Sequence, residues 1–320
     1  MNVLEKIGLT GLVPVVVIDD SANAEPAAEA LMKGGLDVME ITMRTAAGLD
    51  AIRRVRAACP DMLVGAGTVL SVDKAKEAVD AGAQFIVSPG LNPAVVEWCL
   101  SNGIPVTPGC ITQTEIEKAL SYGLKILKFF PADVYGGVKG CKALFGPYKS
   151  EGVSFIPTGG VDLGNLKDYV GQPFIHAVGG GFLCRTDDLA AHNFEAITTT
   201  AKKAVEILLG FEFDHMGINA DSPEKSEETA GLFEKAFGFV PKFGNSSNFA
   251  GPSLEITKFP GLGQNGHIAV KTNSMPRAIH YLSRRGVEVD METAKYKGDK
   301  MIAVYLKEEY AGFAVHLLEK

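Results

Sequence analysis

The chain has 320 residues, of which 46% are hydrophobic and 22% charged, and its formal net charge is −7. This is ordinary globular composition, and the length suits two domains, or one barrel with an added module. The acidic balance excludes a broad basic surface for nucleic acid or anionic membrane, so anionic substrates must be held by local groups.

The apolar piece at residues 12–18 is too short to span a membrane, and Asp19 and Asp20 end it. It also lacks the order of a secretory signal peptide, so we expect a cytoplasmic protein. The cysteine count is odd and no pair has CxxC spacing, which predicts small buried side chains rather than disulfides or a zinc knuckle. The cysteines are Cys59, Cys99, Cys110, Cys141 and Cys184.

Residues 1–210 repeat one pattern: a short β-rich apolar run, a loop rich in Gly, Pro and polar residues, and an amphipathic segment. The apolar runs predict strands at 13–18, 37–42, 63–67, 84–88, 104–107, 125–129, 154–158 and 174–178. The amphipathic segments predict helices at 21–33, 48–58, 71–81, 92–101, 112–121, 162–170 and 193–209. Eight such alternations are typical of an α/β protein with a (β/α)₈ TIM barrel; a doubly wound open sheet is the alternative.

The pattern changes near residue 210, where a new strand leads into a charged, Pro-containing loop. Helices are predicted at 226–238 and 275–286, with strands near 253–258, 267–271, 301–306 and 312–318. A β-α-β-β half thus occurs twice, with weak internal similarity. We expect a smaller α+β domain over 211–320, after a barrel domain over 1–210.

Polar side chains occur where the barrel strands are expected to end, which is where TIM-barrel enzymes carry their active sites. In "VMEITMRT", strand alternation puts Glu40, Thr42 and Arg44 on one face. Glu40 has apolar neighbours, so it either pairs with Arg44 or acts on a substrate. Thr68 ends the third strand and Pro89 lies in the "SPG" turn after the fourth.

Lys128 lies inside the apolar run "KILKFFPA" of the sixth strand. Apolar surroundings disfavour the charged ammonium, and a neutral amine attacks a keto substrate to form a Schiff base. The alternative is a lysine that extends to the barrel mouth and forms an ion pair with Glu40 or Asp133.

Strands seven and eight end in the glycine-rich turns "PTGGVD" and "AVGGGF". Glycine turns at these strands predict a phosphate site, because backbone N–H groups can point at the anion and no Cβ blocks its approach. The candidate residues are Gly159, Gly160, Gly180 and Gly181. The alternative is that both turns are required only by backbone geometry.

The segments "VMEITMRT", "GAGTVL", "GAQFIVSPGLNP", "YGLKILKFFPA", "GGVKG" and "PTGGV" resemble the bacterial 2-dehydro-3-deoxy-6-phosphogluconate (KDPG) / 4-hydroxy-2-oxoglutarate (KHG) aldolases over roughly residues 1–208. The resemblance implies a metal-free class I aldolase, a carbon–carbon lyase that cleaves KDPG to pyruvate and glyceraldehyde 3-phosphate. The alternative substrate is KHG, which yields pyruvate and glyoxylate. The resemblance also implies a homotrimer.

The resemblance further implies roles for four residues. Lys128 forms the imine, Glu40 transfers protons, and Arg44 and Thr68 hold the pyruvate carboxylate. One departure is Gly181, where the family often has a serine whose hydroxyl donates to phosphate. A phosphate-binding barrel isomerase or synthase is the rival reading of the fold, but such an enzyme does not need a lysine inside strand six.

The segments "DHMGIN", "LFEKAFGF", "SLEITKF", "NGHIAV", "AIHYLSRRGVEV" and "AGFAVHLLEK" resemble the vicinal-oxygen-chelate superfamily, of glyoxalase and bleomycin-resistance type. The resemblance implies a divalent zinc, nickel or iron ion held by His215, Glu255, His267 and His316, the last of which is usually Glu. Three His and one Glu are chemically competent for these ions. The alternative is a binding or oligomerisation domain in which these residues have ordinary structural roles.

Overall fold

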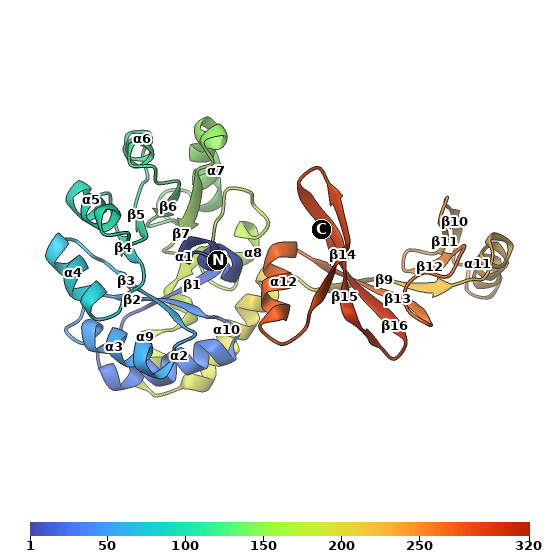
Figure 1. Ribbon diagram of the computed structural model, residues 1–320, viewed down its shortest axis with the longest axis horizontal. Helices are drawn as coiled ribbons and strands as arrows, with labels where there is room; N and C mark the ends of the chain where they lie inside the picture. Colours follow the sequence, from blue (N-terminus) through green and yellow to red (C-terminus); the bar gives the residue numbers. More distant parts are fainter. The chain divides into compact units, whose positions relative to one another are not determined.

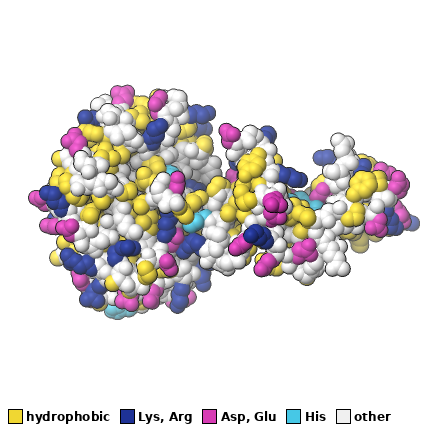
Figure 2. Space-filling view, in the orientation of Figure 1, with side chains coloured by type: hydrophobic (Ala, Val, Ile, Leu, Met, Phe, Trp, Pro, Cys, Tyr) yellow, Lys and Arg dark blue, Asp and Glu magenta, His cyan; other side chains and the backbone are white.

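The computed structural model describes residues 1–320, and the chain divides into two compact units, Met1–Leu208 and Leu209–Lys320. The sequence analysis placed the boundary at residue 210. No helix in either unit combines the length and apolar character needed to cross a bilayer. On the face drawn in Figure 2, acidic and basic side chains are interspersed on each unit rather than gathered by sign.

The first unit is an α/β fold with a curled parallel sheet and helices on its outer side (Figure 1). Six strands pair in the order β5-β4-β3-β2-β1-β8, and β6 pairs with β7. Isolated parallel bridges join Gly109 to Lys128, Phe155 to Ile175 and Thr158 to Gly179. The strands are β1 Leu12–Val16, β2 Val38–Thr42, β3 Leu63–Gly67, β4 Ile86–Ser88, β5 Val106–Pro108, β6 Ile126–Phe129, β7 Ser154–Pro157 and β8 Val178–Gly180.

After α1, helices follow the strands, and several begin at a side-chain cap such as Ser71 or Asn92. They are α1 Val3–Thr10, α2 Ala24–Lys33, α3 Gly48–Ala58, α4 Val72–Asp80, α5 Pro93–Ser101, α6 Gln113–Ser121, α7 Gly137–Tyr148, α8 Leu166–Tyr169, α9 Thr186–Ala190 and α10 Phe194–Leu209. Short 3₁₀ segments cover Ser21–Asn23, Lys149–Glu151 and Gly181–Leu183.

The interior of the curled sheet has two layers of different character. The layer near the strand starts is apolar, and Val3, Leu4 and Ile7 of α1 pack against it. Its buried members are Ile7, Val13, Val38, Leu63, Phe85, Val87, Ile156 and Ala177, with Ile126 partly buried beside them. Two residues further along β2 and β6, alternation presents Glu40 and Lys128 to the same interior. The lysine in the apolar run therefore belongs to the polar layer.

Three sequence-based predictions in this unit were wrong. The eighth strand is β8 rather than 174–178, because the preceding residues turn, with the Ile175 N–H donating to the Gln172 carbonyl at 3.1 Å. The helix predicted at 162–170 is only α8, since Asp162 accepts backbone N–H groups that fold a turn before it. Helix α7 was missed, because its glycines and an internal proline suggest a loop.

The second unit is built on one mixed eight-stranded sheet, in the order β10-β11-β12-β9-β13-β16-β15-β14 (Figure 1). The chain passes through β-α-β-β-β twice, so the predicted β-α-β-β halves lack strands. The edge strands β10 and β14 carry mainly exposed or half-buried side chains, and their apolar pattern is weak. The elements are β9 Glu212–Asn219, α11 Pro223–Phe237, β10 Pro241–Phe243, β11 Ser247–Ala250, β12 Leu254–Thr257, β13 Gly266–Thr272, α12 Met275–Ser283, β14 Val289–Lys297, β15 Lys300–Tyr310 and β16 Phe313–Glu319.

Candidate active site and candidate metal centre

Lys128 and Glu40 form a buried ion pair at the C-terminal end of the curled sheet. The Lys128 Nζ lies 3.3 Å from the Glu40 Oε1, and the two side chains are 8% and 4% exposed. The ammonium also lies 5.3 Å from the centroid of the Phe130 ring. The partner of Glu40 is thus Lys128 and not Arg44, and the partner of Lys128 is Glu40 and not Asp133. A lysine held beside a carboxylate out of water can pass its proton to that carboxylate.

The pair opens into a cavity of about 570 Å³, which brings together Arg44, Thr68 and Pro89 from the ends of β2, β3 and β4. Arg44 lines the cavity and is exposed, unlike the buried Lys128 and Glu40. Thr68 has φ +59°, a left-handed conformation that is uncommon for a residue with a Cβ. Strain of this kind is concentrated at functional sites.

The four glycines of the predicted phosphate site divide into two groups. Gly159 and Gly181 line the cavity, whereas Gly160 and Gly180 do not. Gly160 has φ +68°, and an added Cβ there would lie 2.3 Å from the Asp133 Cβ, so backbone geometry alone requires this glycine. At Gly181 the only atom near an added Cβ is the Val15 carbonyl oxygen at 3.7 Å, so a side chain would fit.

Sequence reasoning missed several residues that line the same cavity. Thr158 is buried directly after β7, Arg185 is the residue before α9, and Thr186 and Asp187 lie in the first turn of α9. Thr158 stands in the "PTGG" turn that was singled out for its glycines alone. Arg185 is the third residue after the "GGGF" run, and a single exposed charge there gives no clear sequence signal.

A parallel α/β sheet with a buried lysine–carboxylate pair at its C-terminal end is the arrangement of a Schiff-base aldolase, a carbon–carbon lyase. The family model for KDPG and KHG aldolase matches residues 3–200. The chain therefore belongs to the KDPG and KHG aldolase family.

Individual relatives agree with this assignment. A 2-dehydro-3-deoxy-phosphogluconate aldolase of Treponema pallidum is 42% identical over 208 residues, which are 65% of this chain and 98% of that protein. A KHG/KDPG aldolase of Escherichia coli K12 is 42% identical over 203 residues, 63% of this chain and 94% of that protein. A crystal structure of the Legionella pneumophila KDPG aldolase, with pyruvate captured as a covalent carbinolamine, is 33% identical with a TM-score of 0.60, covering 62% of this chain and 97% of that one.

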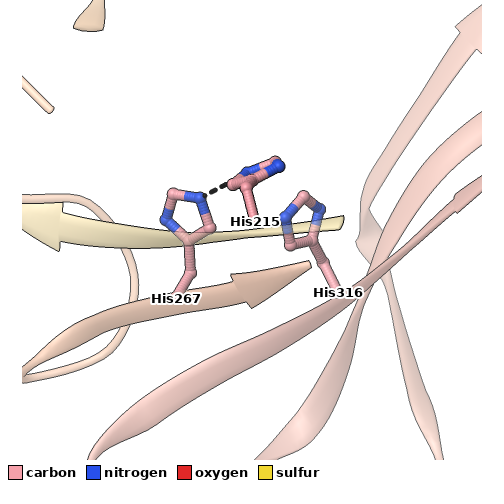
Figure 3. Close-up of side chains that lie close together, drawn as sticks. All are labelled: His215, His267 and His316. Carbon is pink, nitrogen blue, oxygen red and sulfur yellow. Dashed lines mark hydrogen bonds between the residues drawn. The ribbon is translucent and has the colours of Figure 1, made fainter. Parts of the chain in front are cut away.

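The second unit brings its four predicted ligands together. His215, Glu255, His267 and His316 come from β9, β12, β13 and β16, the four central strands of the sheet. The Nε2 atoms of His215 and His267 lie 3.1 Å apart, and the Glu255 Oε2 lies 3.0 Å and 3.2 Å from them. In Figure 3 the three imidazole rings converge, and their ligand atoms all lie within 4.8 Å of one another.

These spacings fit a metal ion. Ligands bonded to zinc at about 2.0–2.1 Å lie about 3.0–3.4 Å from one another, which is the range seen among His215, His267 and Glu255. The His316 Nε2 is buried and has no hydrogen-bond partner, although it lies beside this cluster. A buried polar atom without a partner is costly, and an ion would satisfy it.

The charges around the cluster favour a cation. Hydrogen bonds from His215 and His267 hold the pKa of Glu255 far below its usual range. Burial lowers the pKa of His316 to about 4, so its ring stays neutral and keeps a lone pair for a metal. For His215 burial would lower the pKa, but the hydrogen bonds to Glu255 and Asp214 outweigh it and raise the pKa.

The surrounding residues orient the ligand rings. The His215 Nδ1 lies 2.7 Å from the Asp214 Oδ2, and Lys271 forms an ion pair with the other oxygen of Asp214. The Tyr305 ring stacks on His316, with the centroids 4.7 Å apart. Metal-binding histidines commonly donate their second ring nitrogen to a carboxylate in this way.

Proposed function

We propose that this chain is a class I aldolase that cleaves KDPG to pyruvate and glyceraldehyde 3-phosphate through a Schiff base on Lys128. The observation that carries the proposal is the buried Lys128–Glu40 pair at the mouth of the curled sheet. We infer that this sheet is a (β/α)₈ barrel, since the isolated bridges extend its pairing from β5 to β6 and from β7 to β8.

The reaction begins when Lys128, having passed a proton to Glu40, attacks the C2 ketone of the substrate. Glu40 gives that proton to the carbinolamine hydroxyl, which leaves as water, so Glu40 is again a carboxylate and the remaining protonated imine can accept electrons. Glu40 then removes the proton of the C4 hydroxyl, and the C3–C4 bond breaks. Its electron pair forms the enamine, and the aldehyde departs. Glu40 returns the proton to C3, and hydrolysis of the imine frees pyruvate and Lys128.

Arg44 and Thr68 bind the carboxylate next to the reacting ketone. A guanidinium pairs with a carboxylate through two parallel N–H bonds, and a hydroxyl adds a third donor. Both residues line the cavity that contains Lys128. Pro89 and Gly159 complete the wall on either side, and backbone N–H groups of the glycine turns receive phosphate.

Borohydride reduction in the presence of pyruvate tests the lysine directly. Reduction should add pyruvate covalently to Lys128, because the imine is converted to a stable secondary amine. Peptide mass spectrometry locates the adduct, and Lys128→Met should abolish it. An active preparation that remains unmodified would end the Schiff-base proposal.

A second substrate is KHG, since the relatives include a protein named KHG/KDPG aldolase. Its carboxylate end would occupy the region that takes phosphate in KDPG. A coupled assay for pyruvate release, run with KDPG, KHG and unphosphorylated KDPG, ranks the three by kcat/KM. The homotrimer implied by the resemblance is checked in the same preparation by light scattering.

We further propose that the second unit is a vicinal-oxygen-chelate module with a divalent metal ion on His215, Glu255, His267 and His316. The twofold β-α-β-β-β order and the convergence of four ligand atoms from four central strands support this. Bound zinc, nickel or iron would supply Lewis-acid chemistry toward a small oxo compound. The alternative is a binding or oligomerisation domain without metal.

Metal analysis of the purified chain separates these alternatives. We expect about one equivalent of zinc, nickel or iron per chain, and loss of most of it in His267→Ala, because three ligands hold an ion far less well than four. His192→Asn, an exposed histidine of the first unit, is the matched control. If the protein is still metal-free after growth in metal-supplemented medium and dialysis against metal-containing buffer, the second unit is a binding or oligomerisation domain instead.

A further inference from the structure

Two basic residues of the cavity differ in how exposed their side chains are. Lys128 is 8% exposed, whereas the Arg185 side chain, which lines the same cavity from the segment before α9, is 65% exposed. Lys128 therefore lies deep and Arg185 lies at the mouth. The substrate carbon that reacts must reach the deep end, so the other end of the substrate extends toward the mouth.

Three basic residues line the cavity, and one of them, Arg185, has no role in the mechanism proposed above. Lys128 pairs with Glu40 and attacks the ketone, and Arg44 is the partner proposed for the adjacent carboxylate. Arg185 is the remaining cation of the lining. A substrate with a second anionic group needs a second cation, because an anion brought out of bulk water without a partner loses its solvation.

The contact that Arg185 makes leaves most of its donors available. Its Nη2 lies 3.4 Å from the Asp187 Oδ2, a single contact between side chains that are 65% and 84% exposed. Exposed ion pairs of this kind contribute little to stability. A guanidinium has five N–H donors in a planar fork, so Arg185 can keep Asp187 as a neighbour and still bind phosphate or carboxylate in two places.

The neighbouring Gly181 supplies no side-chain donor. Gly181 lines the same region and presents only its backbone, although the space beside it would accept a side chain. Thr186 adds one hydroxyl to the lining. We propose that Arg185 is a specificity-determining residue that binds the anionic end of the substrate remote from Lys128. This inference rests on the proposed aldolase function.

Selectivity measurements on Arg185→Ala test the proposal. Selectivity is kcat/KM for KDPG, or for KHG, divided by kcat/KM for unphosphorylated KDPG. The loss of a charge-assisted fork should lower both ratios about tenfold, mainly through KM, because the contact is made equally in the ground and transition states. Arg185→Lys should fall between, since it keeps the charge without the fork. Added salt should reduce the wild-type ratios.

The matched control is Arg54→Ala, which removes an equally charged residue from an exposed Arg–Asp pair outside the cavity. Its ratios should equal those of the wild type, so a general effect of net charge is excluded. Asp187→Asn should raise the ratios, since it removes the carboxylate that competes for Arg185.

Two failures are distinguishable. Unchanged ratios in Arg185→Ala, with pyruvate still trapped by borohydride, would overturn the assignment of Arg185 and leave the aldolase standing. Absence of pyruvate trapping and of cleavage in the wild type would instead overturn the proposed function itself. A drop in only the KDPG ratio would assign Arg185 to phosphate, and a drop in only the KHG ratio to carboxylate, each in support of an anion-binding role.

Discussion

At the scale of single residues, the buried Lys128–Glu40 pair is the feature that stability alone does not explain. Removing two charges from water costs several kcal/mol per ion, and a well-packed apolar pair is often as stable. The cost is accepted where the groups react. Glu40 and Lys128 each follow an apolar residue of the same interior face, Val38 and Ile126, by two positions. They lie where the apolar layer ends and the polar layer begins.

Glu40→Gln should separate imine formation from carbon–carbon cleavage. The amide keeps the shape of the carboxylate but cannot accept the C4 hydroxyl proton, so kcat should fall about 10²- to 10⁴-fold. Pyruvate trapping on Lys128 should persist at a lower rate, because the amine can still lose its proton to water and borohydride accumulates the adduct. Steady-state kinetics and mass spectrometry of the trapped protein measure the two effects. Glu77→Gln, on the exposed face of α4, is the control and should change neither. Wild-type turnover in Glu40→Gln would remove this residue from the mechanism.

At the scale of elements, the sequence predicts best where local chemistry and burial agree. The strand at 63–67 and the helix at 48–58 have the predicted bounds, because each has one strong periodicity. Alternation along "VMEITMRT" predicts Glu40, Thr42 and Arg44 on one face, and in the structure Glu40 pairs with Lys128 in the interior of the sheet. The predictions that depend on tertiary context were wrong. The start of β8 is set by the turn before it, and the edge strands β10 and β14 have too few apolar residues to be recognised in the sequence.

The same limit applies to the site. Lys128 and Glu40 could be predicted, since a charged residue inside an apolar run stands out. Arg185 and Asp187 could not, because exposed charges at a helix start resemble any solvated surface until the fold places them on the cavity.

Helix α6 offers a test of local control over an element. Glu115 Oε2 accepts N–H groups of Ile111 and Thr112 and the Thr112 hydroxyl, each at 2.9 Å, in a capping box. Glu115→Ala should lower the free energy of unfolding of the first unit by about 1 kcal/mol, because these donors lose their partner. Urea denaturation followed by circular dichroism measures the change. Gln113→Ala, exposed in the same turn, should cost clearly less, and an equal cost would deny the box a special role.

At the scale of the whole molecule, the chain combines two units whose candidate chemistry is independent. The aldolase residues belong to Met1–Leu208 and the histidine cluster to Leu209–Lys320. The first needs a proton acceptor and no metal, whereas the second has the four side chains that we propose as metal ligands. Each unit has its own buried apolar cluster, so each should respond to its own ligand.

Metal removal should therefore act on one unit only. Dialysis against a strong chelator should lower the melting temperature of one calorimetric transition by several degrees, because a bound ion stabilises the fold by mass action. Pyruvate trapping on Lys128 should be unchanged. Restoring zinc should restore the transition. If the chelator lowered both transitions, or abolished trapping, the two chemistries would not be separable.

Helix α1 closes one end of the curled sheet and so limits how substrate and products reach the cavity. Its side chains Val3, Leu4 and Ile7 pack on the apolar layer at the strand starts, so the cavity is closed at that end. Substrate must then enter, and both products must leave, through the opening at the C-terminal ends of the strands. In the proposed mechanism pyruvate stays covalently bound to Lys128 at the buried end, so we expect the aldehyde to leave first, water to enter next, and pyruvate to leave last. In the reverse direction we expect pyruvate to bind before the aldehyde, because α1 closes the far end of the curled sheet.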